Sequence, residues 1–326
     1  MQITRAPAYR PDRRQAAIHQ LALAAATAEA VAALRGSGVR AILIKGPTIA
    51  GWLYDDPSDR PYCDIDLVVE AGDFVAAEAV LAGLGYESRL LGLRAVETVS
   101  YERPWVRTGG RRAIIDLHRS LSWETIDPGA AWSVLSEGTD LIDLCGTSVE
   151  VPGAAQRTLL LALHAAGDGP QNPKPLADLD LALARLDEPL WRAAAAMADR
   201  LQASEPFAAG LRLRPDGVAL AERLDLAPVA SVEVRLRAGG APVTALGFER
   251  LRARSSTTSR ARFLVGELFP SPAFIRAWRP LASRGTLGLL AVYLWRPLWL
   301  AWMAPRGAWA WSRTRRDAQR VACRQP

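Results

Sequence analysis

The sequence feature that most constrains the fold is the segment DIDLVV, residues 64–69, in which Asp64 and Asp66 begin an otherwise apolar run. In a β-strand successive side chains point to opposite faces, so the two aspartates share one face while Ile65 and Leu67 share the other. Two like charges side by side are destabilising unless water, a basic partner or a metal cation compensates for them. The segment therefore predicts a strand with one apolar face and one charged face.

Apolar periodicity predicts the elements around this strand. Residues 13–34 are alanine-rich with apolar residues at helical spacing, and the pattern stops at Gly36, which predicts a helix. The short β-branched run VRAILIK, residues 39–45, predicts a buried strand that ends at a Lys-Gly pair. Further patterns predict a helix over 72–85, a candidate strand over 86–91, and a hairpin of two strands over 97–107 and 111–119 joined by a Thr-Gly-Gly turn.

The character of the sequence changes near residue 125, after which Ala- and Leu-rich segments between prolines and glycines predict helices with little strand signal. We expect an α/β (α+β) fold in which a mixed β-sheet core flanked by helices is followed by a mainly α-helical domain. The core with its N-terminal helix would cover residues 1–130 and the helical domain residues 150–326. The basic, polar run 253–262 predicts an exposed loop.

Composition excludes a disordered chain, because 50% of the 326 residues are hydrophobic and 23% are charged. The net charge of +6 comes almost entirely from arginine, which suits polyphosphate, nucleic acid or anionic lipid without choosing among them. Cys63, Cys145 and Cys323 lie far apart and outside metal-ligand spacing, which indicates free thiols in a reducing compartment. The first residues lack the pattern of a secretion signal, so we expect a cytoplasmic protein.

One segment near the C-terminus, residues 285–303, is long and apolar enough to span a bilayer, yet Arg296 and Pro297 lie at its centre. A central charge argues against a membrane span. Tryptophans and arginines alternate through and beyond this segment, which leaves two interpretations. We favour a buried core helix or helix pair, and the alternative is an amphipathic anchor that makes peripheral membrane contact.

A third isolated carboxylate, Asp116, lies in the predicted strand AIIDLHR. Magnesium binds through carboxylate oxygens while keeping water and substrate phosphates as its other ligands. In a two-metal site, carboxylates hold both ions against the attacking and leaving oxygens of a phosphoryl transfer. Asp64 and Asp66 would be shared ligands, and Asp116 would complete the site and accept a proton from the attacking hydroxyl.

These residues, taken together, resemble the polymerase-β-like nucleotidyltransferase superfamily, and most closely a bacterial group of uncharacterised members with an LKG-type first motif. The residues that carry the resemblance are ILIKG at 42–46, Tyr54, Arg60, DIDLVV at 64–69, IDLH at 115–118, LALH at 161–164 and PLADLDLAL at 175–183. The resemblance covers about the first 190 residues and, more loosely, the helical remainder. One departure is that Lys45 and Gly46 replace the usual glycine-serine pair of the first motif.

The resemblance implies an enzyme that transfers a nucleoside monophosphate from a nucleoside triphosphate to an acceptor hydroxyl or phosphate with two Mg²⁺ ions. Asp64, Asp66 and Asp116 would be catalytic and metal-binding. Lys45, Gly46, Arg60 and His118 would bind the nucleotide. The acceptor stays open among small molecules, peptides or proteins and RNA, with a link to natural-product or polysaccharide biosynthesis.

Two other functions compete with this interpretation. One is an RNA-modifying, toxin-type nucleotidyltransferase that holds RNA on its basic helical domain, and the other is a catalytically silent binding or membrane-surface module. Individual residues also have structural alternatives: Asp116 could pair with Arg112 or Arg119, and His118 could be a packed core residue. His164 and Asp178 are weaker candidates that depend on the resemblance alone.

Overall fold

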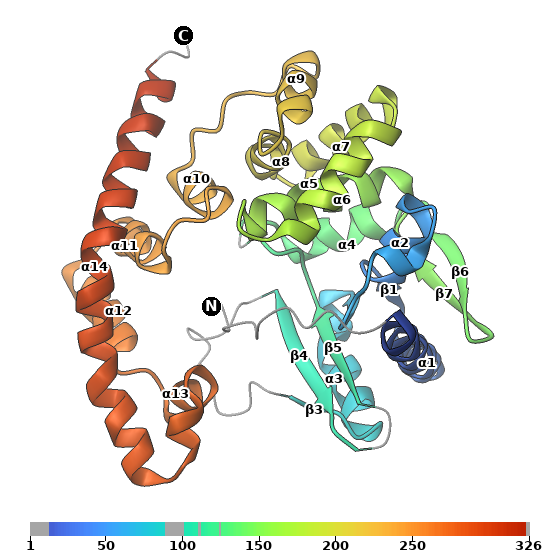
Figure 1. The fold of residues 1–326 in the computed structure, drawn as a ribbon, viewed down its shortest axis with the longest axis horizontal. Coiled ribbons are helices and arrows are strands. Elements are labelled where there is room, and N and C mark those ends of the chain that lie inside the picture. The colour runs from blue at the N-terminus through green and yellow to red at the C-terminus, as the bar shows by residue number, and fades with distance from the viewer. Residues whose placement is uncertain (1–12, 89–100, 110–111, 124, 324–326) are drawn as a thin grey trace.

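The computed structural model describes residues 13–88, 101–109, 112–123 and 125–323, and within them a seven-stranded mixed sheet forms the centre of the fold (Figure 1). The strand order is β3–β4–β5–β2–β1–β7–β6. In chain order the strands are β1 Ala41–Leu43, β2 Ile65–Val69, β3 Glu87–Ser88, β4 Glu102–Arg107, β5 Ala113–His118, β6 Asp140–Leu144 and β7 Thr147–Val151. The predicted α+β fold is confirmed.

Register at the middle of the sheet brings the predicted acidic residues together. Strand β2 runs parallel to β5, and Asp66 lies directly opposite Asp116. Strands β4 and β5 form the predicted antiparallel hairpin, in which Glu102 pairs with His118. Because paired residues on neighbouring strands point to the same face, these side chains project from one face of the sheet. Part of the predicted strands, residues 89–100 and 110–111, lies outside the described residues.

One face of the sheet is covered by α1 (Arg13–Gly36) and α3 (Phe74–Gly83). Leu23 and Leu34 of α1 pack with Leu67 of β2 and Leu117 of β5 in a single core cluster whose members are almost completely buried. The helix predicted over residues 13–34 ends two residues later than expected. Its packing on the sheet makes it a core helix. Its burial on the sheet also fixes which face of β2 is apolar.

The opposite face, from which Asp66 projects, is covered by helices that follow the strands. They are α2 (Pro47–Leu53), α4 (Pro128–Ser136) and α5 (Ala154–Asp168). Val68 of β2 and Ile42 of β1 belong to the same core cluster as Leu159 and Leu163 of α5. The acidic face of β2 is thus directed towards the helical part of the chain, at the end of the strand where apolar packing stops.

A hairpin of β6 and β7, which the low strand signal after residue 125 did not predict, extends the sheet beyond β1. Strand β7 pairs parallel with β1 through Ile42 and Glu150, and Val149 and Val151 are buried in the core beneath α1. Strands in this position extend the sheet to residue 151. The division into units at 1–130 and 150–326 stays a prediction.

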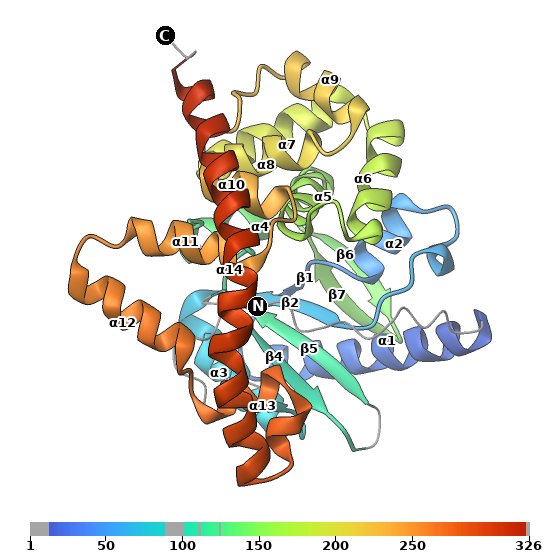
Figure 2. The same cartoon turned by 60° about the vertical axis from the view of Figure 1, so that its left-hand side comes forward.

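The remaining chain is helical, as expected. The helices of the region next to the sheet are α6 Pro173–Arg185, α7 Glu188–Arg200, α8 Ser204–Leu211, α9 Pro215–Arg223 and α10 Val232–Ala238. The helices of the C-terminal region are α11 Val243–Ala253, α12 Thr257–Leu268, α13 Pro272–Trp278 and α14 Thr286–Ala322. Short 3-10 helices are η1 Pro57–Asp59, η2 Ala71–Asp73 and η4 Pro280–Ser283. Figure 2 shows α14 crossing the molecule as one long rod beside α11, α12 and α13.

The prediction of a loop over residues 253–262 was wrong for its second half, because α12 begins at Thr257. The Ser256 side chain accepts a hydrogen bond from the backbone N–H of Ser259, which is the contact of a helix N-cap. Residues 254–258 are exposed as expected. Polarity and charge therefore indicated solvent exposure correctly but did not distinguish a loop from a solvated first turn.

The preferred interpretation of residues 285–303 as a buried core helix was also wrong. They belong to α14, a single continuous helix that contains Pro297 and Pro305. Two helices among the described residues have the length and mean hydropathy of a membrane span, Ala17–Gly36 and Thr286–Val321. The first lies in α1 and packs on the sheet, whereas only 17% of the apolar window of the second is buried.

Candidate active site

Asp66 is the centre of the charged cluster, and this residue is 5% exposed at the start of β2. Its Oδ1 atom accepts a hydrogen bond from Lys45 Nζ at 3.0 Å and lies 3.1 Å from His118 Nε2. Lys45 reaches it from the turn after β1, and His118 reaches it from β5. Two cationic or proton-bearing side chains therefore converge on one carboxylate oxygen.

The electrostatics of this group follow from burial opposed by pairing. Burial alone would raise the pKa of Asp66, but the Lys45 ammonium and the His118 hydrogen bond hold that pKa well below its usual range. Burial alone would lower the pKa of Lys45, yet the Asp66 charge raises it above its ordinary value. The pair is therefore fully ionised near neutral pH, with Lys45 as a fixed positive charge.

Asp116 stands beside this pair without a partner of its own. Within the described residues its side chain forms no hydrogen bond or ion pair, so the alternative of a pair with Arg112 or Arg119 is not realised. Burial, followed by the negative charge of Asp66, raises the pKa of Asp116 from 3.8 to about 7. Its carboxylate is therefore destabilised by a like charge at the same face of the sheet.

His118 is 1% exposed and links Asp66 to Glu102, a residue that the sequence analysis did not single out. The Nδ1 atom lies 3.5 Å from Glu102 Oε2, which is a charge contact and not a hydrogen bond. Burial by itself would lower the pKa of His118, but the Asp66 hydrogen bond and the Glu102 charge raise it. His118 is therefore both a buried core residue and a direct neighbour of the acidic cluster.

The Lys-Gly turn places Lys45 by means of a backbone conformation that requires glycine. Gly46 has φ of 67°, and a Cβ atom there would lie 3.3 Å from Cδ2 of the Tyr62 ring. Pro47 follows as the first residue of α2. The chain thus turns sharply from β1 into a helix at the point where Lys45 enters the site.

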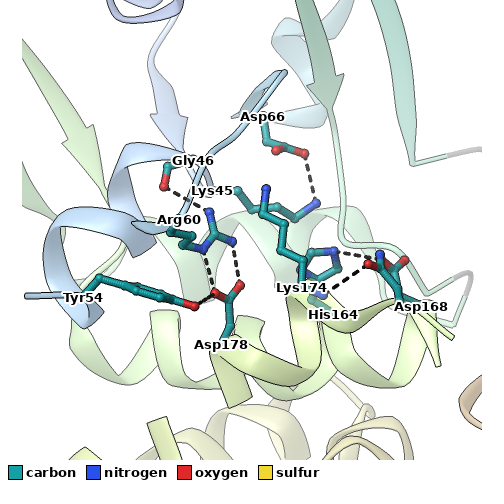
Figure 3. Close-up of polar contacts among 10 residues, drawn as sticks. Lys45, Gly46, Tyr54, Arg60, Asp66, His164, Asp168, Lys174 and Asp178 are labelled. Carbon is teal, nitrogen blue, oxygen red and sulfur yellow. Dashed lines mark hydrogen bonds and ion pairs between the residues drawn. The ribbon is translucent and has the colours of Figure 1, made fainter. Parts of the chain in front are cut away.

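Arg60 was predicted to bind the triphosphate directly, and the structure places it in a buried contact with Asp178 of α6. Its Nε and Nη2 atoms donate to the two Asp178 oxygens at 2.8 and 2.7 Å, while Nη1 donates to the Gly46 carbonyl at 3.3 Å (Figure 3). Arg60 is 3% exposed and Asp178 is fully buried. The Tyr54 hydroxyl completes the group by donating to Asp178 Oδ1 at 2.7 Å. In this arrangement Arg60 braces the Lys-Gly turn against α6, and Asp178 is its counter-charge.

Lys174, at the start of α6, is a site residue that the sequence analysis missed. Figure 3 draws its half-buried side chain in the same group as Lys45, Arg60 and Asp178. Burial and the positive charge of Arg60 lower the pKa of Lys174, whereas Asp64 and Cys63 act in the opposite direction. Its ammonium group forms no ion pair with the described side chains. The chain contains only two lysines, and both point into this region.

Two other predicted residues lie at the edge of this group. Asp64 precedes β2 by one residue and is partly exposed, and its charge contributes to the raised pKa of Asp116. His164 of α5 lies with its Nε2 atom 3.4 Å from Asp168 Oδ2, one helical turn further along the same helix. The fold therefore gathers Asp64, Asp66 and Asp116 into one electrostatic cluster and leaves His164 in a local pair.

The acidic residues of the site have the chemistry of ligands for a divalent cation. Carboxylate oxygens are the ligands that Mg²⁺ prefers, and the pKa of Asp116 is raised in part by the like charge of Asp66, which a cation would offset. Among the described side chains, however, no three His, Cys, Asp or Glu groups already converge on a single point, and the Lys45 ammonium lies against Asp66. The residue types fit a Mg²⁺ ion. In this structure the Lys45 ammonium provides part of the positive charge that such an ion would bring to Asp66.

The mixed sheet thus carries an acidic cluster beside the Lys-Gly turn. The model of an uncharacterised nucleotidyltransferase family matches residues 7–215, which include every site residue described above. The chain belongs to this nucleotidyltransferase family, and it is therefore a transferase whose substrate class is a nucleoside triphosphate. No curated protein matches the chain.

Two solved structures are similar in fold. The solution structure of the antibiotic-resistance factor ANT(2'')-Ia is 18% identical, with 60% of this chain and 97% of that chain covered and a TM-score of 0.39. An antigenic nucleotidyltransferase-like protein from Paracoccidioides brasiliensis is 13% identical, with 64% and 93% covered and a TM-score of 0.36.

Proposed function

We propose that this nucleotidyltransferase catalyses metal-dependent transfer of a nucleoside monophosphate from a nucleoside triphosphate to an acceptor hydroxyl or phosphate. In this reaction a new bond forms between the acceptor oxygen and the α-phosphorus, and the bond from the α-phosphorus to the β-phosphate oxygen breaks. Pyrophosphate leaves, and the acceptor proton passes to a base on the protein. The register that sets Asp66 beside Asp116 is the observation that carries the proposal.

Asp64, Asp66 and Asp116 would hold two Mg²⁺ ions, because the fold brings their carboxylates together where β2 begins beside β5. When bound, such ions neutralise charge on the phosphates and polarise the reacting oxygens. The protein contributes fixed positions for the acids, since both strands are buried in the core on their opposite faces.

Lys45 and Lys174 would contact the triphosphate. Lys45 already carries a fixed positive charge at the acidic cluster, and Lys174 has an ammonium group without an ion-pair partner among the described side chains. Lysine is a compact charge on a flexible stem and can move from a carboxylate to a phosphate oxygen. Arg60 would act indirectly, by holding the Gly46 carbonyl and thus the turn that directs Lys45.

Asp116 would accept the proton of the attacking group. Its side chain forms no hydrogen bond or ion pair with the described residues, so its oxygens are available to a substrate hydroxyl. Asp66 in contrast is held by two partners and would serve to position charge. His118 would orient Asp66 through the contact at 3.1 Å.

The proposal is tested by incubating the protein with each α-labelled nucleoside triphosphate, Mg²⁺ and a lysate separated into protein, RNA and small-molecule fractions. We expect label transfer to one fraction and its loss in Asp66→Asn. Asp216→Asn is the matched control, because Asp216 is an exposed aspartate in α9, away from the sheet. Transfer that persists in Asp66→Asn would place the active site elsewhere, and transfer to no fraction from any triphosphate would contradict the function.

A further inference from the structure

The C-terminal region differs sharply in charge from the rest of the chain. Residues 250–326 contain 15 arginines and two acidic residues, Glu267 and Asp317, which gives a net charge of +13. Since the whole chain carries +6, residues 1–249 carry −7. The modest overall charge therefore conceals a strongly basic module, residues 250–326, which we call the C-terminal module and which includes the end of α11 and all of α12 to α14, attached to an acidic body.

The outer face of α14 is apolar along more than half of the helix. Exposed large side chains recur at spacings of three, four or seven residues, which places them on one side of a helix. Each of these residues is between 56% and 83% exposed, and they are Leu287, Leu290, Leu294, Leu298, Trp302 and Trp309. In Figure 1 this helix forms the edge of the molecule farthest from the sheet.

The inner face of α14 explains why the outer one has no partner within the protein. Val292 and Arg296 are buried against α13 and η4, and Arg296 lies 4.9 Å from the centres of the Phe274 and Trp278 rings. Farther along, the Trp311 Nε1 atom donates to Glu249 of α11 at 2.7 Å. The neighbouring helices thus hold one side of α14, and the apolar stripe lies on the opposite side.

Arginines extend the outer face towards the C-terminus of the helix. Arg306 stacks over Trp302 at 4.7 Å from the ring centre, and Arg313 stacks over Trp309 at 5.5 Å. Both tryptophans are more than 60% exposed. Exposed Trp and Arg side chains that alternate beside leucines are typical of helices that lie in the interface between lipid headgroups and acyl chains.

We propose that the C-terminal module binds an anionic lipid bilayer, with the leucines of α14 inserted below the headgroups and the arginines paired with lipid phosphates. The net charge of +13 is complementary to an anionic surface. The helix would lie in the plane of the interface, since α11, α13 and η4 cover its other side. The acidic body would then face away from the membrane.

Other occupants of this face fit less well. A second copy of the chain would bring two modules of the same strong positive charge together, which is unfavourable. RNA would pair with the arginines, but it has no surface to bury four leucines in a row. A helix that crosses the bilayer would have to expose buried Arg296 and its Glu267 contact to acyl chains.

The experiment measures pelleting of the full-length protein with vesicles of phosphatidylcholine alone or with one quarter phosphatidylglycerol. We expect binding to the anionic vesicles to be at least about tenfold tighter. Arg313→Gln with Arg316→Gln should weaken it about 25-fold, from roughly a fivefold contribution per basic residue near the surface. Leu294→Gln with Leu298→Gln should weaken it at least about tenfold through lost apolar insertion. All four side chains are exposed, so these variants keep the fold.

Matched controls come from the acidic body. Val75→Gln with Leu141→Gln removes two exposed apolar side chains, and Arg192→Gln with Arg223→Gln removes two exposed arginines, so neither pair should change binding. Equal binding to neutral and anionic vesicles, or binding to neither, would overturn the proposal. So would vesicle binding unaffected by the leucine pair, as expected of a site for RNA or another polyanion. A dimer in lipid-free solution that the leucine pair dissociates would instead assign the stripe to a second copy.

Discussion

The two charged regions of this protein use their charges in opposite ways. At the sheet, charged side chains are buried and engaged within the fold, as Asp66 is by Lys45 and His118 and Arg60 is by Asp178. In the C-terminal module most arginines lie at the surface, some over exposed aromatic rings, and the leucines beside them are exposed as well. Burial and pairing fix a few charges in place at the sheet, whereas the module presents many charges to its surroundings.

The difference between the two regions also explains why one uses lysine and the other arginine. Both lysines of the chain lie at the acidic cluster, and every other basic residue except histidine is an arginine. A lysine ammonium can follow a phosphate oxygen as a substrate binds, whereas arginine is suited to flat, two-pronged contact with phosphates or carboxylates. The site therefore requires movable charge, and the module requires a charged surface.

The largest expected effect separates binding from chemistry at the sheet. Asp116→Asn should leave triphosphate affinity nearly unchanged, because Asp64 and Asp66 remain, yet it should slow single-turnover transfer. Loss of a general base typically costs about 100- to 10,000-fold. A contact formed as the nucleophile develops charge affects turnover more than ground-state affinity. Rapid-quench measurement of labelled product at saturating triphosphate gives the rate.

Variants of the C-terminal module provide the control for this prediction. Leu294→Gln with Leu298→Gln should transfer label to a soluble acceptor at the parent rate, since the stripe lies outside the acidic cluster. If Asp116→Asn transfers label at the parent rate at saturating triphosphate, Asp116 is a structural residue of the hairpin. The contrast between a catalytic region at the sheet and a binding region at the C-terminus would then fail.

The next effect concerns stability and compares two aspartates on α6. Asp178→Asn should lower the free energy of unfolding by about 3–5 kcal/mol, because it leaves the buried Arg60 charge without its partner. Asp180→Asn removes an exposed partner of Arg214 and should cost less than about 1 kcal/mol. Urea unfolding of the two variants measures the difference. Equal losses would show that burial does not govern the strength of these pairs.

A smaller effect, on triphosphate affinity, is expected from substitution of the two lysines. Lys45→Ala and Lys174→Ala should each weaken triphosphate binding by roughly 10- to 100-fold, as expected for a charge-assisted contact of about 1.5–3 kcal/mol. Lys45→Arg should retain more affinity than Lys45→Ala because the charge persists. Isothermal titration with a non-hydrolysable triphosphate measures these affinities. Unchanged affinity in both alanine variants would remove the lysines from the substrate site.

The sequence predicted those parts of the fold that depend on local pattern. Alternation of apolar and acidic residues predicted β2, and the Thr-Gly-Gly turn predicted the hairpin of β4 and β5. The hairpin of β6 and β7 was missed because its exposed edge strand has no clean alternation, as in the exposed residues Leu141 and Asp143. The exposure of α14 was missed for another reason: a leucine and tryptophan stripe has the same sequence whether protein or lipid covers it.

Prediction of the site was limited by contacts that are distant in sequence. The three acids could be proposed from their strands, but the register that aligns Asp66 with Asp116 depends on the packing of the whole sheet. Lys174 lies more than 100 residues after Asp66 in the sequence and joins the site only because α5 and α6 fold over the sheet. The scarcity of lysine was a usable signal, since two lysines in an arginine-rich chain mark positions where arginine does not serve.

The smallest expected effect tests whether the acidic cluster is strained in the absence of a cation. The pKa of Asp116 is raised from 3.8 to about 7 in the folded state, so between these values the folded protein binds more protons than the unfolded one. Stability contributed by this group is therefore fully present below about pH 4 and is lost as pH rises towards 7. The shift corresponds to at most about 4 kcal/mol, and structural relaxation should reduce the observed effect to about 1–2 kcal/mol.

Asp116→Asn removes this penalty, and the variant should therefore match the parent below about pH 4 but exceed it in stability by about 1–2 kcal/mol at pH 8, with EDTA present. Urea unfolding at the two pH values measures the difference, and the contributions of Asp66 and His118 largely cancel because both proteins contain them. Mg²⁺ should then stabilise the parent at pH 8 more than the variant, because a ligand that binds only the folded state raises its stability.

Asp317→Asn, in the C-terminal module, is the control, since its exposed contact with Arg320 should contribute less than about 1 kcal/mol at either pH. An offset in Asp116→Asn that is the same at both pH values and insensitive to Mg²⁺ would mean that the three acids do not repel one another. The charges at the sheet would then be as independent of their neighbours as those on the surface of α14.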